Sequence, residues 1–153
     1  MNTRESRNYT HSKCKTQTEV SGAEFSALSD PLAGMKETFC AQCDGHFPLS
    51  EFVWSDTSEK ITDYYARHGA KATDADRFLF STPGLGLLAG GGFFLGVMFG
   101  ALLYFAIGGM AGFIVALILG LVGAVAGVVV CETVLKPKIL GRVCGVSDTR
   151  NLQ

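Results

Sequence analysis

Residues Phe78 to Cys131 read FLFSTPGLGLLAGGGFFLGVMFGALLYFAIGGMAGFIVALILGLVGAVAGVVVC, fifty-four positions without a charged side chain. A single membrane-spanning helix needs roughly 20 apolar residues to cross a hydrocarbon core of about 30 Å. The stretch is therefore long enough for two spans and a tight turn, and too long for one. It predicts a transmembrane helical hairpin, with spans over residues 83–105 and 109–130.

Local signals at both ends agree with these limits. Pro83 suits the first turn of a helix, where its missing amide hydrogen costs nothing, and Ser81 or Thr82 can cap the helix start. At the other end, Glu132 marks the return to water, and Pro137 predicts that the helix does not continue.

Glycines are concentrated in the hairpin, where thirteen of the nineteen lie between Gly84 and Gly127. In water each would weaken a helix by roughly 1 kcal/mol relative to alanine. In lipid the backbone has no alternative hydrogen-bond partner, and small residues let two helices approach closely. The predicted helix-packing positions are Gly92, Gly96, Gly100, Gly108, Gly112, Gly120, Gly123 and Gly127.

The four-residue glycine spacing resembles the glycine-zipper two-span hairpins of many small bacterial membrane proteins. The resemblance implies helix packing and not chemistry. Because each span carries two small-residue faces, we expect one face to pack against another copy of the chain or another membrane protein. The alternative is that the glycines only close the hairpin. The spans contain no carboxylate, which argues against a proton-coupled pump or transporter.

Charged residues are divided between the two flanks of the hairpin. Residues 1–77 hold nine of the thirteen Lys and Arg, residues 132–153 hold four, and the turn near Gly108 holds none. By the positive-inside rule, both termini are expected in the cytoplasm and the hairpin in an inner or plasma membrane. The five cysteines then lie in or next to a reducing compartment, so disulfides are not expected.

The N-terminal residues 1–36 are polar, with scattered apolar side chains, and they predict a flexible tail. Phe25, Leu28 and Leu32 follow a helical spacing, which leaves a short docking helix as the alternative.

Residues 37–72 regain aromatic and aliphatic side chains and predict a small module. Within it we expect a helix at 57–68, with Asp56 and Glu59 as a capping box and Gly69 at its end.

A connector at 73–82 leads into the hairpin, and residues 131–153 form the predicted cytoplasmic tail. The predicted fold class is therefore an all-α membrane protein, a transmembrane helical hairpin with a small cytoplasmic N-terminal module that resembles a zinc knuckle.

The module contains FCAQCDG at residues 39–45, in which two cysteines at Cys-x-x-Cys spacing can face one metal ion. With the continuation HFPLSEF at 46–52, the segment resembles the opening of small treble-clef zinc fingers. Those fingers close with a second Cys-x-x-Cys pair, and here Tyr65 and His68 stand at the corresponding positions. The resemblance thus implies His68 as a ligand and leaves the third position without one.

A structural zinc site needs four ligands. The predicted ligands are Cys40, Cys43, His68 and His46, with Cys14 and Cys144 as alternatives for the fourth. The opposing interpretation is a degenerate finger that binds no metal, with its cysteines as free thiols.

No catalytic triad, His-Glu-x-x-His helix or phosphate-binding loop is present in the sequence, so we do not expect an enzyme. The sequence also lacks a basic run suited to nucleic acid. The predicted function is an oligomerising adaptor or assembly component, with membrane lipid and either a second copy or another membrane protein as partners. The alternative is a pore-forming or membrane-perturbing hairpin, as in a holin, a toxin or a secreted effector.

Overall fold

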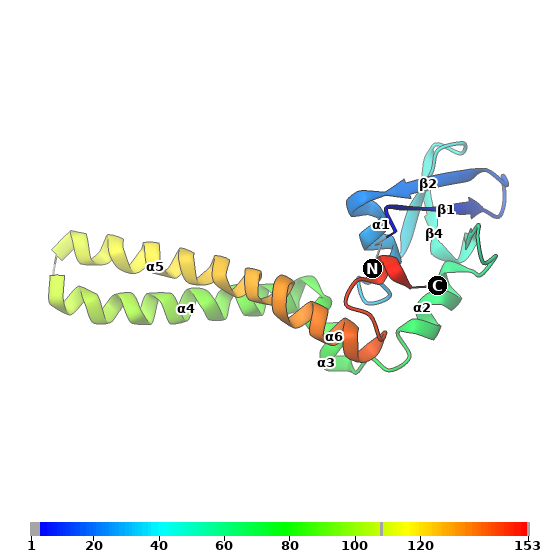
Figure 1. The fold of residues 1–153 in the computed structure, drawn as a ribbon. Helices are drawn as coiled ribbons and strands as arrows, with labels where there is room; N and C mark the ends of the chain where they lie inside the picture. Colours follow the sequence, from blue (N-terminus) through cyan, green and yellow to red (C-terminus); the bar gives the residue numbers. More distant parts are fainter. Residues whose placement is uncertain (1–3, 108, 153) are drawn as a thin grey trace. The chain divides into compact units, whose positions relative to one another are not determined.

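The fold comes from a computed structural model that describes residues 4–107 and 109–152. The chain forms two compact units (Figure 1). The globular unit comprises Met1–Arg77 and Ile139–Gln153, and the hairpin unit comprises Phe78–Lys138. The hairpin is therefore an insertion between two parts of one globular unit.

The globular unit is built on two small antiparallel sheets, with strand order β2-β1-β5 in the first and β3-β4 in the second. The strands are β1 (Ser6–His11), β2 (Gln17–Ser21), β3 (Glu37–Cys40), β4 (Gly45–Pro48) and β5 (Phe52–Trp54). The helices are α1 (Gly22–Ser29), α2 (Ile61–His68), α3 (Asp74–Phe80), α4 (Thr82–Ile107), α5 (Gly109–Val130) and α6 (Lys136–Val143). Short 3-10 helices lie at Leu49–Glu51 and Thr149–Asn151.

The prediction of an all-α fold is wrong, because the N-terminal residues form strands. The reason lies in β1, whose inward-facing side chains are Arg7, Tyr9 and His11. An amphipathic strand is normally recognised by alternating apolar residues, and here two of the three buried positions are polar.

The buried side chains of Arg7 and Tyr9 in β1 have hydrogen-bond partners from elsewhere in the globular unit. Arg7 makes a bidentate pair with Asp56, with an Nη2 to Oδ1 distance of 2.8 Å, and stacks 4.0 Å above the Trp54 ring. The Tyr9 hydroxyl donates to the Phe39 carbonyl at 2.7 Å. Because buried polar groups cost free energy unless they are hydrogen-bonded, these partners allow a polar strand to lie inside a core.

The expected flexible tail is also ordered beyond β2. The structure forms α1 there, with Phe25 and Leu28 fully buried and Leu32 buried just after it. This is the docking helix that the sequence left as the alternative. Tyr64 and Tyr65 of α2 donate their hydroxyl hydrogens to the carbonyls of residues 29 and 28, which ties α2 to the end of α1.

One hydrophobic core holds the globular unit together, and the C-terminal segment completes it. Leu152 is buried in this core, and the Thr149 hydroxyl lies 3.2 Å from the hydroxyl of Ser29. The buried core residues are Tyr9, Val20, Phe25, Leu28, Cys40, Leu49, Phe52, Trp54, Ile61, Tyr64 and Leu152. The segment expected to be a tail is thus part of the fold.

The predicted helix at 57–68 begins later, at Ile61, and the predicted capping box does not form. Asp56 pairs with Arg7 and Arg4, and Glu59 pairs with Arg67. Both carboxylates therefore form ion pairs with arginines instead of capping the start of α2.

A reciprocal cap of the predicted kind is instead found at the start of α3. Asp76 Oδ2 accepts from the Thr73 amide at 2.9 Å, and the Thr73 hydroxyl accepts from the Asp76 amide at 3.2 Å. Arg142 of α6 also pairs with Asp76. The predicted connector therefore begins a helix and joins the two parts of the globular unit.

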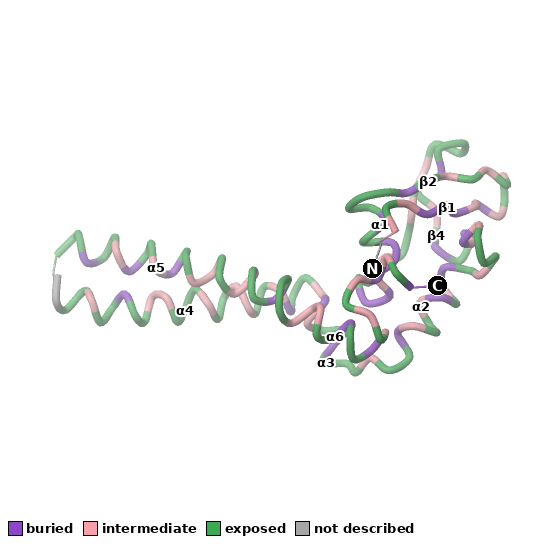
Figure 2. Tube along the Cα trace, in the orientation of Figure 1, coloured by how far each residue is buried: buried purple, intermediate pink, exposed green. Residues whose placement is uncertain are grey.

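The hairpin unit consists of α4 and α5, which begin and end within two residues of the predicted spans. Ser81 caps α4, since its hydroxyl accepts from the Gly84 amide at 3.3 Å. Many large apolar residues of the hairpin are exposed. Figure 2 accordingly shows mostly exposed and intermediate colours along α4 and α5. Both helices are long and apolar enough to span a membrane.

The described packing glycines bring α4 and α5 together. A Cβ added at Gly92 would meet the backbone of Gly123, and one at Gly100 would meet Ala116. Gly96 faces Leu119, Gly127 faces Leu88, Gly112 faces Tyr104, and Gly120 faces Val97 and Phe93. The eighth predicted position, Gly108, lies outside the described residues.

Pro137 does not end the second helix, contrary to the sequence expectation. A π-helical turn at Cys131–Leu135 precedes it, and α6 continues from Lys136. A proline in a helix removes one amide donor and crowds the carbonyl four residues earlier. The wider π-helical turn contains the carbonyl that Pro137 would crowd. The helix therefore continues past Pro137.

Candidate metal centre

Two hairpin turns supply the candidate metal ligands, and they share one local design. In each turn the first ligand ends a strand, the second follows three residues later, and the next residue has a positive φ. The β1–β2 turn carries His11 and Cys14, followed by Lys15 at φ 60°. The β3–β4 turn carries Cys40 and Cys43, followed by a left-handed aspartate.

The backbone pairing of the two turns also matches. The His11 amide donates to the Thr16 carbonyl at 3.1 Å, and Cys40 pairs with Gly45 at the same separation along the chain. A left-handed residue after the second ligand lets the chain reverse while both ligand side chains stay on one side.

The four ligand atoms lie within 4.8 Å of one another, so these residues can hold a metal ion. Cys14 Sγ lies 3.4 Å from His11 Nδ1 and 3.5 Å from Cys40 Sγ, and Cys43 Sγ lies 3.6 Å from His11 Nδ1. Usual zinc bond lengths give tetrahedral edges of about 3.6 Å between sulfur and nitrogen and about 3.8 Å between sulfurs. The observed spacing fits one tetrahedral ion.

His11 is fixed in place by groups around its ring. It is 1% exposed, lies between the rings of Phe47 and Phe52 at centroid distances of 4.8 and 4.7 Å, and directs Nδ1 at the sulfurs. Its Nε2 lies 3.2 Å from Glu51 Oε2. A carboxylate on the far nitrogen of a ligating histidine fixes the tautomer and the ring orientation.

Glu51 is itself held by its surroundings. Lys13 Nζ pairs with its other oxygen at 2.8 Å, and the Glu51 carbonyl accepts from the Ser12 amide at 2.8 Å. The hydrogen bond from Lys13, and then the one from His11, lower the pKa of Glu51. The carboxylate is therefore charged at neutral pH and suited to accept a hydrogen from the imidazole.

The thiols of the cluster differ in acidity. Hydrogen bonds from the Thr16 side chain and backbone lower the pKa of Cys14 to about 6. The hydrogen bond with Cys14, followed by burial, raises the pKa of Cys43 to about 11. The lowered pKa of Cys14 favours its thiolate, which is the form of cysteine that binds metal.

The structure brings together Cys40 and Cys43 as predicted, with Cys14 from the set of alternatives. It does not bring His46 or His68 to this cluster. The His46 ring packs against Phe39 at 5.5 Å, and the His68 ring against Tyr64 at 4.6 Å.

The other residues considered from the finger resemblance also have different partners. Tyr65, at the missing third ligand position, donates to the Leu28 carbonyl. Cys144 donates to the His68 carbonyl, with 3.6 Å between donor and acceptor, and burial raises its pKa to about 11.

His11 is the ligand that sequence reasoning missed. The signal was present, because His11 and Cys14 have the same three-residue separation as Cys40 and Cys43. The polar composition of residues 1–36 predicts a flexible tail, and such a tail would not be expected to supply metal ligands. All five cysteines are free thiols in the structure.

No protein-family model, characterised protein or solved structure matches this chain. The assignment of the candidate metal centre and of the hairpin is therefore supported by their geometry alone.

Proposed function

We propose that this protein is a membrane-anchored adaptor, in which a two-span hairpin holds a zinc-stabilised recognition domain at the membrane surface. The observation that carries the proposal is the closed cluster of His11, Cys14, Cys40 and Cys43 in a unit interrupted by an uncharged hairpin. The first feature supplies a small folded domain, and the second supplies an anchor.

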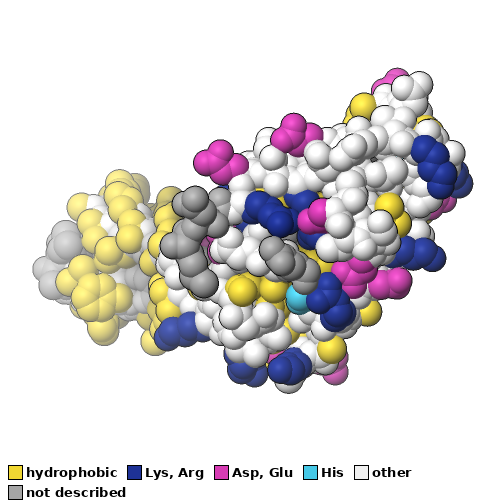
Figure 3. All heavy atoms as spheres, turned by 45° about the vertical axis from the view of Figure 1, so that its right-hand side comes forward, with side chains coloured by type: hydrophobic (Ala, Val, Ile, Leu, Met, Phe, Trp, Pro, Cys, Tyr) yellow, Lys and Arg dark blue, Asp and Glu magenta, His cyan; other side chains and the backbone are white. Residues whose placement is uncertain are grey.

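The surface of the hairpin supports residence in a membrane. In the most hydrophobic 18-residue stretch of each helix, only 6% of the stretch is buried in the first helix and 11% in the second. Large side chains such as Phe105 and Met110 are 83% and 76% exposed. In Figure 3 the visible part of the hairpin shows hydrophobic side chains, whereas charges of both signs are interspersed over the globular unit. Contiguous apolar surface of this extent is suited to lipid or to another apolar partner.

The insertion of the hairpin supports one topology. Residues on both sides of it belong to the same globular unit, so two antiparallel spans return the chain to the side from which it left. Lys60, Arg67, Lys71 and Arg77 precede the hairpin and Lys136, Lys138 and Arg142 follow it, which favours the cytoplasm for that side. A reducing cytoplasm also keeps the thiolates available for metal.

Zinc is the ion that best suits the ligand set. Three thiolates and one imidazole in a tetrahedral arrangement are typical of structural zinc sites. All four positions come from the protein, which leaves no open position for a substrate, as a catalytic zinc would need. The site therefore favours a structural role and a binding function over an enzymatic one.

The proposal does not depend on oligomerisation. The described packing glycines face the partner helix of the same hairpin, as expected if they only close it. Gly86, Gly90 and Gly91 have nothing within 4 Å of an added Cβ, so any contact with a second membrane protein would use a different face.

Metal analysis of the purified full-length chain tests the proposal. We expect one zinc per chain, and a cobalt-substituted form with intense thiolate-to-cobalt absorption. His11→Gln and Cys40→Ser should lose the metal, whereas the matched variants His46→Gln and His68→Gln should keep it. Metal loss in all four variants, or in neither of the first two, would contradict this assignment.

A second measurement tests the anchor and the pore-forming alternative. The chain should resist alkaline extraction from membranes and should not release dye from liposomes. Extraction by alkali would remove the membrane part of the proposal, and dye release would favour the pore.

A further inference from the structure

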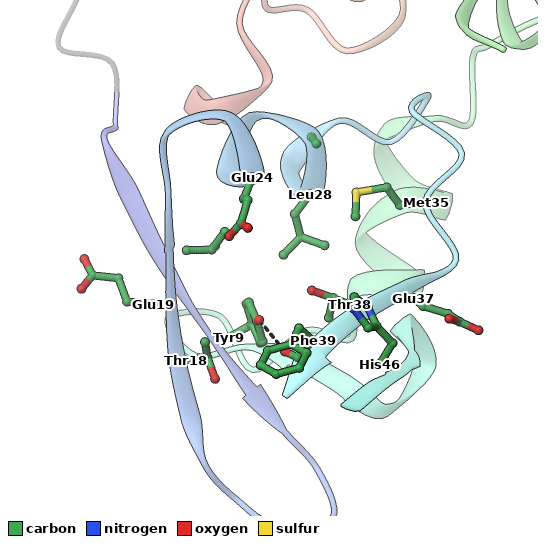
Figure 4. Close-up of a pocket in the computed structure, with 12 residues that line it drawn as sticks. Tyr9, Thr18, Glu19, Glu24, Leu28, Met35, Glu37, Thr38, Phe39 and His46 are labelled. Carbon is green, nitrogen blue, oxygen red and sulfur yellow. Dashed lines mark hydrogen bonds between the residues drawn. The ribbon is translucent and has the colours of Figure 1, made fainter. Parts of the chain in front are cut away.

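A cavity of about 390 Å³ opens on the globular unit between β2, α1 and the β3–β4 hairpin (Figure 4). Its inner wall is formed by core residues, among them Tyr9, Val20 and Leu28, which are 4%, 4% and 1% exposed. The volume lies in the range typical of ligand pockets. The cavity therefore reaches the hydrophobic core from the surface.

An exposed aromatic side chain lines this cavity. Phe39 is 40% exposed, and among the described residues of the globular unit it is the large hydrophobic side chain that remains exposed. Its position is fixed, because its carbonyl accepts from the Tyr9 hydroxyl and its ring packs against His46. Met35, which is partly buried against the core, also lines the cavity. These groups offer an apolar surface to an incoming side chain.

The charge around the cavity has one sign. Glu19, Glu24 and Glu37 line it, and no lysine or arginine does. Within residues 4–107 and 109–152, none of the three carboxylates has an ion-pair partner. Figure 4 shows Glu24 extending from α1 into the space beside Leu28, while Glu19 and Glu37 point outward on opposite sides. The cavity thus combines an apolar wall, one inward carboxylate and an acidic mouth.

We propose that this cavity binds a lysine or arginine side chain from a basic segment of a partner protein. Long cationic side chains pack their methylene stems on apolar surface and keep the charged group near carboxylates. Here the stem would lie on Phe39, Leu28 and Met35, and the cation would meet Glu24. Glu19 and Glu37 would attract neighbouring cations and repel acidic partners. The inference rests on the proposed adaptor function and names the chemistry of its partner.

Methyl NMR tests the inference on the full zinc-loaded chain in zwitterionic micelles. The chain has four methionines, at positions 1, 35, 98 and 110, so ¹³C-methyl labelling gives one reporter at the cavity and two in the hairpin. The probe is the peptide Ac-Gly-Ser-Arg-Lys-Ser-Gly-NH₂, and its control has norleucine at both cationic positions.

We expect the basic peptide to shift the Met35 resonance and leave those of Met98 and Met110 unchanged. Glu24→Gln should weaken binding at least tenfold, and the matched variant Glu5→Gln should not change it. Raising the salt concentration should also weaken binding, because the carboxylates are close to solvent.

The inference is overturned if Met35 does not respond, if the norleucine peptide binds equally well, or if the two glutamate variants behave alike. Zinc content and membrane extraction are measured on the same samples. If both are retained while the peptide fails to bind, the inference fails and the proposed function stands.

Discussion

Glu51 has a position from which it can control the metal site without touching the metal. It contacts the far nitrogen of His11, while Lys13 holds its second oxygen. With Phe47 and Phe52 on the two faces of the imidazole, the ring has few orientations left. The orientation of the His11 ring is therefore fixed by protein groups alone.

Replacing this carboxylate should weaken the site measurably. We expect Glu51→Gln to lower zinc affinity by about ten- to a hundredfold, the usual effect of removing a partner of a ligating histidine. Competition with a chromophoric chelator at neutral pH measures the affinity. Glu59→Gln is the control, because Glu59 pairs with Arg67 instead. Equal losses in the two variants would show that the effect is not specific to His11.

At the residue scale, two of the four candidate ligands were predictable from the sequence. Cys40 and Cys43 were predictable because both ligands lie in one turn, so their spacing is a local property. His11 and Cys14 lie in another hairpin. The pairing of β1 with β5 and the hydrogen bond from the Tyr9 hydroxyl to the Phe39 carbonyl help to bring the two turns together. His68 was predicted from the zinc-finger resemblance, and His46 was predicted as a candidate for the fourth ligand. Neither prediction used distance in space, and the structure places both outside the cluster.

At the scale of elements, α3 is a short helix, and its stability depends on the cap at its N-terminus. The reciprocal bonds between Thr73 and Asp76 satisfy amide groups that a helix start leaves unpaired. The amide and hydroxyl of Thr73, together with Arg142, lower the pKa of Asp76.

Asp76→Asn should destabilise the globular unit by about 1 kcal/mol at neutral pH, the usual value of a helix cap. A carboxyl whose pKa is lowered on folding stabilises the folded state above its unfolded pKa and loses that effect as pH falls through the folded value. The difference between wild type and variant should therefore stay constant from pH 8 to pH 5. Urea unfolding at several pH values measures it, and a difference that shrinks within this range would contradict the lowered pKa.

In the hairpin, the glycines differ sharply in what surrounds them. A Cβ at Gly96 would meet the backbone of Leu119, whereas one at Gly90 would meet nothing within 4 Å. We expect Gly96→Ala to destabilise the helix pair by about 1–3 kcal/mol through overpacking. Gly90→Ala should leave it unchanged. Thermal unfolding in detergent, followed by circular dichroism, compares the variants, and equal melting would mean that α4 and α5 do not approach so closely.

Over the whole molecule, a globular unit made of two chain segments is the main feature that the sequence did not predict. The hairpin was predictable because hydropathy is a local property that needs no knowledge of the rest of the fold. Leu152 belongs to the same buried core as residues more than eighty positions earlier in the chain, such as Tyr64. A short polar C-terminal segment carries no pattern that reveals this burial.

Leu152→Ala tests whether the C-terminal segment belongs to the core. Truncating a buried leucine costs about 2–5 kcal/mol. Trp54 is the only tryptophan in the chain and lies in the same core, so its fluorescence reports urea unfolding. The exposed neighbour provides the control, and Asn151→Ala should change stability by less than about 0.5 kcal/mol. A loss as small for Leu152→Ala as for the control would place the segment outside the core.

The division of the globular unit around the hairpin also orders events during synthesis. Both turns of the candidate metal centre precede the hairpin in the sequence, so all four candidate ligands are synthesised before α4. The core includes Leu152 from the segment that follows the hairpin, so in the proposed topology it closes only after the second span has returned to the starting side. A chain that crossed the membrane once would leave its last segment on the opposite side. Without Leu152, the core around Trp54 would then be incompletely covered. In the proposed topology, closure of the core would therefore depend on correct insertion of both helices of the hairpin.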